Sequence, residues 1–242
     1  MELLYEGKAK KIFSSVAYSW QVEADCATMY FKDDATAFNN EKKSSFKGKG
    51  ELNCWISQHM FQLLDHFHIP THYVKGLSEK ELVVKLLDII PIEVICRNVA
   101  AGSFCKRYGI SHGKLFESPI VEYCLKDDDF GDPLINSDSI IVLGYATQEE
   151  LKKMKDLTRK INVILHATFR TVGLVLVDFK LEFGKDKEGK IYLADEICPD
   201  TVRLWDTKTS KSFDKDLYRY EKGDLLAGYK EVKRRLLLHN GE

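Results

Sequence analysis

Charged side chains interrupt one apolar segment of the sequence at every second position. The stretch 174–183 places Asp178, Lys180 and Glu182 between apolar residues. Side chains of a β-strand point alternately to its two faces, so these three groups share one face while their apolar neighbours can enter a core. Asp178 and Glu182 would lie about 13 Å apart along such a strand, which suits two Mg²⁺ ions, or one ion beside an extended substrate. We therefore expect a metal or nucleotide site here, with a solvated hairpin face as the alternative.

A charged turn follows this segment. Residues 184–189 begin and end with glycine, which predicts a hairpin whose second strand covers residues 190–194. The returning strand would place Asp195 or Glu196 roughly opposite Asp178. Four carboxylates in a small area repel one another unless a cation lies among them, and this favours bound metal.

Two lysines near the N-terminus form the first basic group. Lys8 and Lys10 follow Gly7 and point to one face if the segment is extended. The spacing is not that of a Walker A motif, but a glycine-containing strand–turn–strand with lysines can fold over a nucleotide, as the glycine-rich loop of kinases does. A solvated basic hairpin is the alternative.

Arginines and a serine form a second basic group. Arg97 ends an apolar stretch, and Ser103 follows a turn of small residues. If Ser103 starts a helix, its hydroxyl, the backbone N–H groups and Arg97 could face one anion; a capped helix beside a surface arginine is the alternative. Arg203 offers a planar guanidinium that suits a phosphate or a carboxylate, and a salt bridge with Asp200 or Asp206 is the alternative there.

Overall composition limits the possible partners. The chain has 242 residues, and its 36 Lys and Arg nearly cancel its 37 Asp and Glu, which argues against a nucleic-acid-binding module. The six cysteines contain no C-x-x-C pair, which favours reduced thiols over a zinc site or disulfides. Residues 1–8 lack the features of a secretory signal, and no apolar stretch approaches the ~20 residues of a membrane span. We expect a cytoplasmic protein without a membrane or nucleic-acid partner.

The elements that must position these residues indicate an α+β fold. Short strands are expected within residues 2–32, including 20–22, and strands again at 71–74, 82–87 and 92–98. Apolar spacing predicts helices over 51–67, from a Thr147/Glu150 capping box to about 171, and over 223–238, with a short helix at 102–108. Residues 46–50 are expected to form a flexible basic loop, and residues 110–146 an irregular region. A boundary near residue 75 would divide the chain into domains 1–75 and 76–242.

Several motifs together resemble a known enzyme family. The segments LYEGKAK (4–10), IPIEVICR (90–97) with AGS (101–103), and LVDFKLEFG (176–184) are similar to signatures of the phosphoribosylaminoimidazole-succinocarboxamide synthase (SAICAR synthetase) family. ADE (194–196) with PD (199–200), RLWD (203–206) and DKD (214–216) fit as well. The resemblance runs from about residue 3 to 238 in the same order as in the family.

The resemblance implies both a fold and a reaction. The fold is a small, mostly antiparallel sheet domain packed on a larger α+β domain, with an ATP cleft between them. The reaction is a step of de novo purine biosynthesis in which an ATP-dependent ligase condenses carboxyaminoimidazole ribonucleotide with L-aspartate. It yields the succinocarboxamide, ADP and phosphate, with Mg²⁺ and through an acyl phosphate. A homodimer is also implied. A small-molecule kinase that uses the same ATP and Mg²⁺ site is the alternative.

Residue roles follow only from matching these motifs. Lys8, Lys10 and Lys126 would contact ATP, and Glu182 and Asp195 would hold Mg²⁺, with Asp178 as a third candidate ligand. The residues expected near the reacting carboxylate are Asp178, Lys180 and Arg203. The ribonucleotide would be bound by Arg97, Ser103, Asp200 and Arg203. Asn40 stands where many relatives carry glycine, and asparagine tolerates a left-handed turn better than most residues.

Overall fold

A five-stranded sheet built from the first third of the chain forms one side of the molecule. The computed structural model describes residues 2–14, 25–38 and 41–239. The strand order is β1-β2-β3-β7-β6, and every neighbouring pair is antiparallel. These strands are β1 (Leu3–Glu6), β2 (Lys10–Ser14), β3 (Cys26–Phe31), β6 (Tyr73–Ser78) and β7 (Glu81–Lys85). The strand expected at residues 20–22 and the turn at Asn40 lie outside the described residues.

Helix α1 (Lys49–His66) packs against this sheet, and a small hairpin of β4 (Asp34–Ala37) and β5 (Lys42–Ser45) precedes it. The expectation of a flexible loop at 46–50 is wrong for its last two residues, because Lys49 and Gly50 are buried in the first turn of α1. A Cβ atom on Gly50 would lie 2.4 Å from the carbonyl oxygen of Phe31. Only glycine therefore lets the helix start this close to the end of β3.

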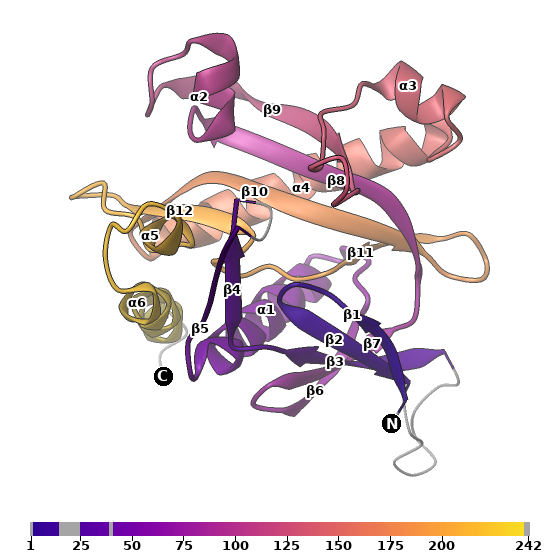
Figure 1. Ribbon diagram of the computed structural model, residues 1–242, viewed down its shortest axis with the longest axis horizontal. Coiled ribbons are helices and arrows are strands. Elements are labelled where there is room, and N and C mark those ends of the chain that lie inside the picture. Colours follow the sequence, from indigo (N-terminus) through magenta and orange to yellow (C-terminus); the bar gives the residue numbers. More distant parts are fainter. Residues whose placement is uncertain (1, 15–24, 39–40, 240–242) are drawn as a thin grey trace.

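The second sheet forms the other side of the molecule (Figure 1). Its strands run in the order β11-β10-β8-β9, and β12 also pairs with β10; all pairs are antiparallel. The prediction of an irregular region at 110–146 is wrong, because this stretch contains β9 (Leu115–Leu125) and α3 (Ser137–Val142). The strands are β8 (Asp88–Val99), β9 (Leu115–Leu125), β10 (Leu174–Lys185), β11 (Ile191–Ala194) and β12 (Val202–Asp206).

Helix α4 (Gln148–Thr171) covers one face of the second sheet. Its predicted capping box is present, since Thr147 Oγ1 accepts from the Glu150 backbone N–H and the Glu150 carboxylate accepts from the Thr147 N–H. The apolar side of α4 is buried against β10, as the helical spacing predicted. The remaining helices are α2 (Ser103–Tyr108), α3 (Ser137–Val142), α5 (Asp216–Arg219) and α6 (Leu225–His239).

The two sheets share one hydrophobic core. Met29 and Phe31 of β3 and Phe61 of α1 belong to the same buried cluster as Phe179 and Phe183 of β10. The first sheet includes β6 and β7, so a division of the chain by sheets falls between Lys85 and Asp88. The domain boundary near residue 75 stays a prediction. In the described part of the chain no helix is long and apolar enough to cross a membrane.

Candidate active site

A cavity of about 1450 Å³ lies between the two sheets. The β1–β2 turn, β4, β8, β10 and the segment after β11 all contribute to its lining. It exceeds the ~300–1,000 Å³ typical of a pocket for one small ligand, so it has room for more than one substrate. Every site residue that the sequence predicted lines it: Lys8, Lys10, Arg97, Ser103, Lys126, Asp178, Lys180, Glu182, Asp195, Asp200 and Arg203.

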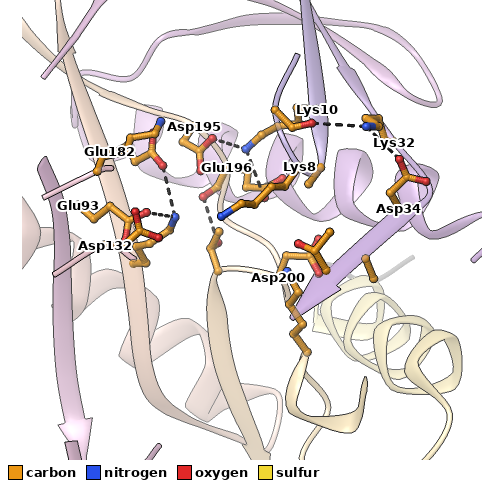
Figure 2. Close-up of a pocket in the computed structure, with 18 of the residues that line it drawn as sticks. Lys8, Lys10, Lys32, Asp34, Glu93, Asp132, Glu182, Asp195, Glu196 and Asp200 are labelled. Atoms are coloured by element: carbon orange, nitrogen blue, oxygen red, sulfur yellow. Dashed lines mark hydrogen bonds and ion pairs between the residues drawn. The ribbon is translucent and has the colours of Figure 1, made fainter. Parts of the chain in front are cut away.

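One end of the cleft holds lysines among carboxylates. Lys10 Nζ contacts Asp195 and lies 3.3 Å from Glu196 Oε1. Lys180 Nζ lies 2.5 Å from Glu93 Oε1 and 3.4 Å from Glu182 Oε1. Figure 2 shows Lys10 directed toward Asp195 and Glu196. Glu93 and Glu182 lie together on the other side of these two acids. Each of these charges therefore has an opposite charge within reach.

This pairing sets the protonation of the lysines. Burial alone would lower the pKa of Lys10, but the charges of Asp195, Glu196 and Glu182 outweigh it and raise the pKa above its usual value. The pKa of Lys180 is raised in the same way, because Glu182 and Glu93 outweigh its burial. Both side chains are consequently ammonium ions at neutral pH and can meet phosphate oxygens.

The register of β10 corrects one prediction. Glu182 pairs with Ala194 across the hairpin, so Asp195 follows directly beside Glu182 and not opposite Asp178. The predicted position was wrong because the turn covers residues 186–190 and β10 continues to Lys185. Asp195 also has a φ of 61°, a left-handed conformation that is uncommon for residues other than glycine. Strain of this kind is typical of functional sites.

Arginines flank Asp178 at the other end of the cleft. Asp178 pairs across the sheet with Arg97 of β8 and with Arg203 of β12. Its Oδ2 atom accepts a hydrogen bond from Arg97 Nη1 at 3.1 Å and another from Arg203 Nη1. Arg203 also contacts Asp216, whose Oδ2 accepts a hydrogen bond from Arg203 Nε at 2.7 Å. The predicted alternative partners of Arg203, Asp200 and Asp206, are therefore wrong.

Asp200 belongs to a buried network that sequence reasoning missed. Its Oδ2 atom contacts Lys49 Nζ and accepts from Asn53 Nδ2 at 2.9 Å, and its Oδ1 accepts from the Tyr229 hydroxyl at 2.6 Å. The Lys49 side chain is wholly buried. Burial would raise the pKa of Asp200, but Lys49 and the other donors hold it below its usual range. No local pattern could reveal this pair, whose members lie 151 residues apart.

The carboxylates differ in their suitability for a metal ion. Among the described His, Cys, Asp and Glu residues, three ligand atoms come within 4.8 Å of one another only at Glu196, Cys198 and Asp200, and Lys49 already contacts Asp200 of this group. Asp178, Glu182 and Asp195 do not form such a group, in agreement with the ~13 Å expected between Asp178 and Glu182 along the strand. Glu182 and Asp195 are neighbours across the hairpin and line the cleft, which fits the one or two carboxylates that Mg²⁺ usually takes. Asp178 contacts two guanidinium groups, and its place as a third ligand stays a prediction.

Fold and site together define a class of protein: an α+β protein in which lysines and arginines, each paired with carboxylates, face one cleft between antiparallel sheets. The comparison with known families then identifies the family. The model of the SAICAR synthetase family matches residues 3–236, so the chain belongs to that family.

Individual relatives match over nearly the whole chain. The phosphoribosylaminoimidazole-succinocarboxamide synthases of Pelagibacter ubique and Finegoldia magna are 50% and 49% identical to it. The alignments cover 98% of this chain in both cases, and 90% and 99% of those proteins. The crystal structure of the synthase from Ehrlichia chaffeensis superposes with a TM-score of 0.92 at 45% identity, covering 97% of this chain and 98% of that one.

A SAICAR synthetase solved in complex with ADP is also similar, with a TM-score of 0.91, 47% identity and 97% coverage of both chains. These relatives confirm the predicted family and the predicted α+β fold. They give no support to the small-molecule kinase that the sequence left open as the alternative.

Proposed function

We propose that this chain is an ATP-dependent carbon–nitrogen ligase that condenses carboxyaminoimidazole ribonucleotide with L-aspartate, giving the succinocarboxamide ribonucleotide, ADP and phosphate. One observation carries the proposal. Strand β10 presents Asp178, bonded to two arginines, and Glu182, bonded to lysines, to the same cleft, with Lys180 between them. Two anionic substrates can therefore meet over one strand.

The nucleotide would occupy the end lined by the β1–β2 turn. Lys8 and Lys10 lie at this turn, and Lys126 approaches from the second sheet to contact Glu182. Phosphoryl transfer depends mainly on positioning and charge neutralisation, and three ammonium groups around one cleft supply both. The similar synthetase with bound ADP supports nucleotide binding by a cleft of this fold.

The ribonucleotide would occupy the arginine end. Arg97, Arg203 and Ser103 line this part of the cleft, and guanidinium groups suit bidentate contacts with phosphate. Gly102 gives Arg203 the space it needs, because a Cβ atom there would lie 2.9 Å from Arg203 Nη2. Asp200 lines the cavity, but its oxygens already bond to Lys49, Asn53 and Tyr229. The role of Asp200 is therefore structural: it fixes the side chains that form this side of the cavity.

The reaction proceeds in two balanced steps. The substrate carboxylate oxygen attacks the γ-phosphorus of ATP, the bond to the β,γ-bridging oxygen breaks, and ADP and an acyl phosphate form. The uncharged amine of aspartate then attacks the acyl carbon, phosphate departs with the electron pair of the C–O bond, and the amine nitrogen loses a proton. Lys180, held by Glu93 and Glu182, is placed to orient the carboxylate and to balance the charge on the transferring group.

Mg²⁺ would be held by Glu182 and Asp195 together with ATP oxygens, as the donor set described above allows. Such an ion lowers the cost of bringing negative oxygens together. Lys10 and Lys126 contact the same two carboxylates and keep them oriented toward the cleft. A homodimer and a cytoplasmic location remain predictions.

The direct test is mass detection of the product. Purified protein is incubated with ATP, Mg²⁺, aspartate and the carboxylated ribonucleotide, and each component is left out in turn. We expect the succinocarboxamide ribonucleotide only in the complete mixture, with one ADP released per product. Full ADP release without aspartate, and no condensed product with it, would indicate a kinase and overturn the proposal.

Variants at the arginine end test the site assignment. Asp178→Asn and Arg203→Ala each remove a preorganised charge from the cleft, and we expect turnover to fall at least ~100-fold. Wild-type rates in both variants would contradict the placement of the ribonucleotide.

A further inference from the structure

Glu122 of β9 lies behind the arginine end of the cleft and contacts two arginines at once. Its Oε2 atom accepts from Arg97 Nε at 2.5 Å, and its Oε1 accepts from Arg107 Nη2 at 2.7 Å. Arg107 in turn donates through Nη1 to Ser103 Oγ at 3.1 Å. One carboxylate is thus linked to both ligand-facing groups, Arg97 directly and Ser103 through Arg107.

Glu122 itself does not line the cavity, whereas Arg97 and Ser103 do. Its side chain is 10% exposed and that of Arg97 is 5% exposed. Because Arg97 bonds to Glu122 through Nε and to Asp178 through Nη1, two of its three nitrogens are fixed. Nη2 makes no hydrogen bond within the described part of the chain. The plane of the guanidinium is therefore set by two carboxylates, and one edge is left to bind a ligand.

We propose that Glu122 is a positioning residue for the ribonucleotide phosphate: it fixes the orientation of Arg97 and, through Arg107, that of the Ser103 hydroxyl. This inference rests on the proposed function, since it assigns the phosphate to Arg97 and Ser103. Glu122 acts through these side chains and touches no substrate. A bidentate or forked contact is sensitive to the plane of the guanidinium, so loss of the anchor weakens phosphate binding even though all cations remain.

A purely electrostatic role for Glu122 makes the opposite prediction. Removing a negative charge beside Arg97 makes the local potential more positive, which on its own would strengthen the binding of an anion. Positioning and counter-charge roles therefore change the affinity for the ribonucleotide in opposite directions. The sign of the change decides between them.

The experiment compares Glu122→Gln with Glu231→Gln. Glutamine keeps the size of the side chain but directs an N–H₂ group at one of the two arginines, so one of the charged hydrogen bonds is lost. Glu231 on α6 is a matched control, because its carboxylate also contacts two arginines, Arg234 at 2.7 Å and Arg235 at 2.8 Å, and it does not line the cleft. KM is measured for the ribonucleotide and for ATP, and ADP binding is measured by titration.

We expect Glu122→Gln to raise KM for the ribonucleotide about 10-fold or more, the effect of losing one hydrogen bond to a charged group, while KM for ATP and ADP binding stay unchanged. Glu231→Gln should change neither KM. A ribonucleotide KM that is unchanged or lower in Glu122→Gln would overturn the positioning role. Loss of ADP binding in that variant would overturn it too, because Glu122 would then support the fold as a whole.

Arg97→Ala separates this inference from the proposed function. If Arg97→Ala leaves the ribonucleotide KM unchanged, the phosphate site itself is misplaced and both proposals fail. If Arg97→Ala raises that KM and Glu122→Gln does not, the proposed function stands and only the role of Glu122 fails.

Discussion

Removal of one partner from the buried pair of Lys49 and Asp200 should destabilise the fold strongly. Lys49 begins α1 on the first sheet, and Asp200 lies in the segment after β11 of the second. The Lys49 side chain has no exposed surface and that of Asp200 is 3% exposed. Lys49 Nζ also donates to the backbone carbonyl of Asp34 at 3.0 Å, so one ammonium group joins three segments.

Lys49→Met keeps the apolar stem and removes the charge. Loss of one partner of a buried ion pair typically costs about 3–5 kcal/mol, because the remaining charge has no counter-ion. Asp200 would keep hydrogen bonds from Asn53 and Tyr229, which favours the lower end of that range. We therefore expect the free energy of unfolding to fall by about 3 kcal/mol, a large part of the 5–15 kcal/mol typical of a domain.

Urea denaturation followed by circular dichroism measures this difference. The matched control is Lys187→Met, because Lys187 pairs with Asp25 on the surface, where the side chains are 81% and 54% exposed. Exposed pairs contribute little, so the control should change stability by less than about 0.5 kcal/mol. If Lys49→Met costs no more than Lys187→Met, the buried pair does not hold the two sheets together and the reasoning is refuted.

Three further predictions concern local features. Gly50→Ala should destabilise the fold by more than about 1 kcal/mol in urea titrations, because its Cβ would lie 2.4 Å from the Phe31 carbonyl oxygen; an unchanged midpoint would contradict this. Thr147→Ala should cost about 0.5–2 kcal/mol by removing the cap of α4, and equal melting curves would show that the cap contributes nothing. Burial raises the pKa of Asp214 from 3.8 to about 6, so the folded state binds more protons than the unfolded state between these values. As pH rises from 3.8 to about 6, the free energy of unfolding of the wild type should therefore fall by on the order of 3 kcal/mol relative to that of Asp214→Asn. A difference between the two free energies that does not change with pH would refute the assignment.

The sequence predicted the elements whose capping residues or apolar spacing lie within one helix or one strand. The α4 helix was readable because Thr147 and Glu150 cap it and its apolar residues recur at helical spacing. The alternation around Asp178 and Glu182 identified β10 and the face that lines the cleft. Strand β9 was missed because Pro119 and charged residues interrupt its apolar pattern.

Long-range pairing was the part that local patterns could not predict. Counting residues back from the hairpin placed Asp195 opposite Asp178, but the register of the sheet, and not the turn alone, determines which residues face each other. Lys49 was expected in a flexible basic loop, because its partner Asp200 lies 151 residues away and leaves no mark on the local sequence. Glu122 gave no signal for the same reason, since its two arginines come from β8 and α2.

The near-equal numbers of acidic and basic residues correspond, in the cleft, to cations and carboxylates that contact one another. Lys10, Lys180, Arg97 and Arg203 face the cavity, and each contacts at least one carboxylate of the same chain. Buried cations without such partners would carry a large desolvation cost, so the acids are a condition for placing these groups here at all. A phosphate that binds must share or displace those carboxylates, and the net gain is smaller than the number of cations implies. Affinity in this cleft should therefore depend on how well each cation is aimed at the phosphate, which is why a carboxylate outside the cavity, such as Glu122, can control binding.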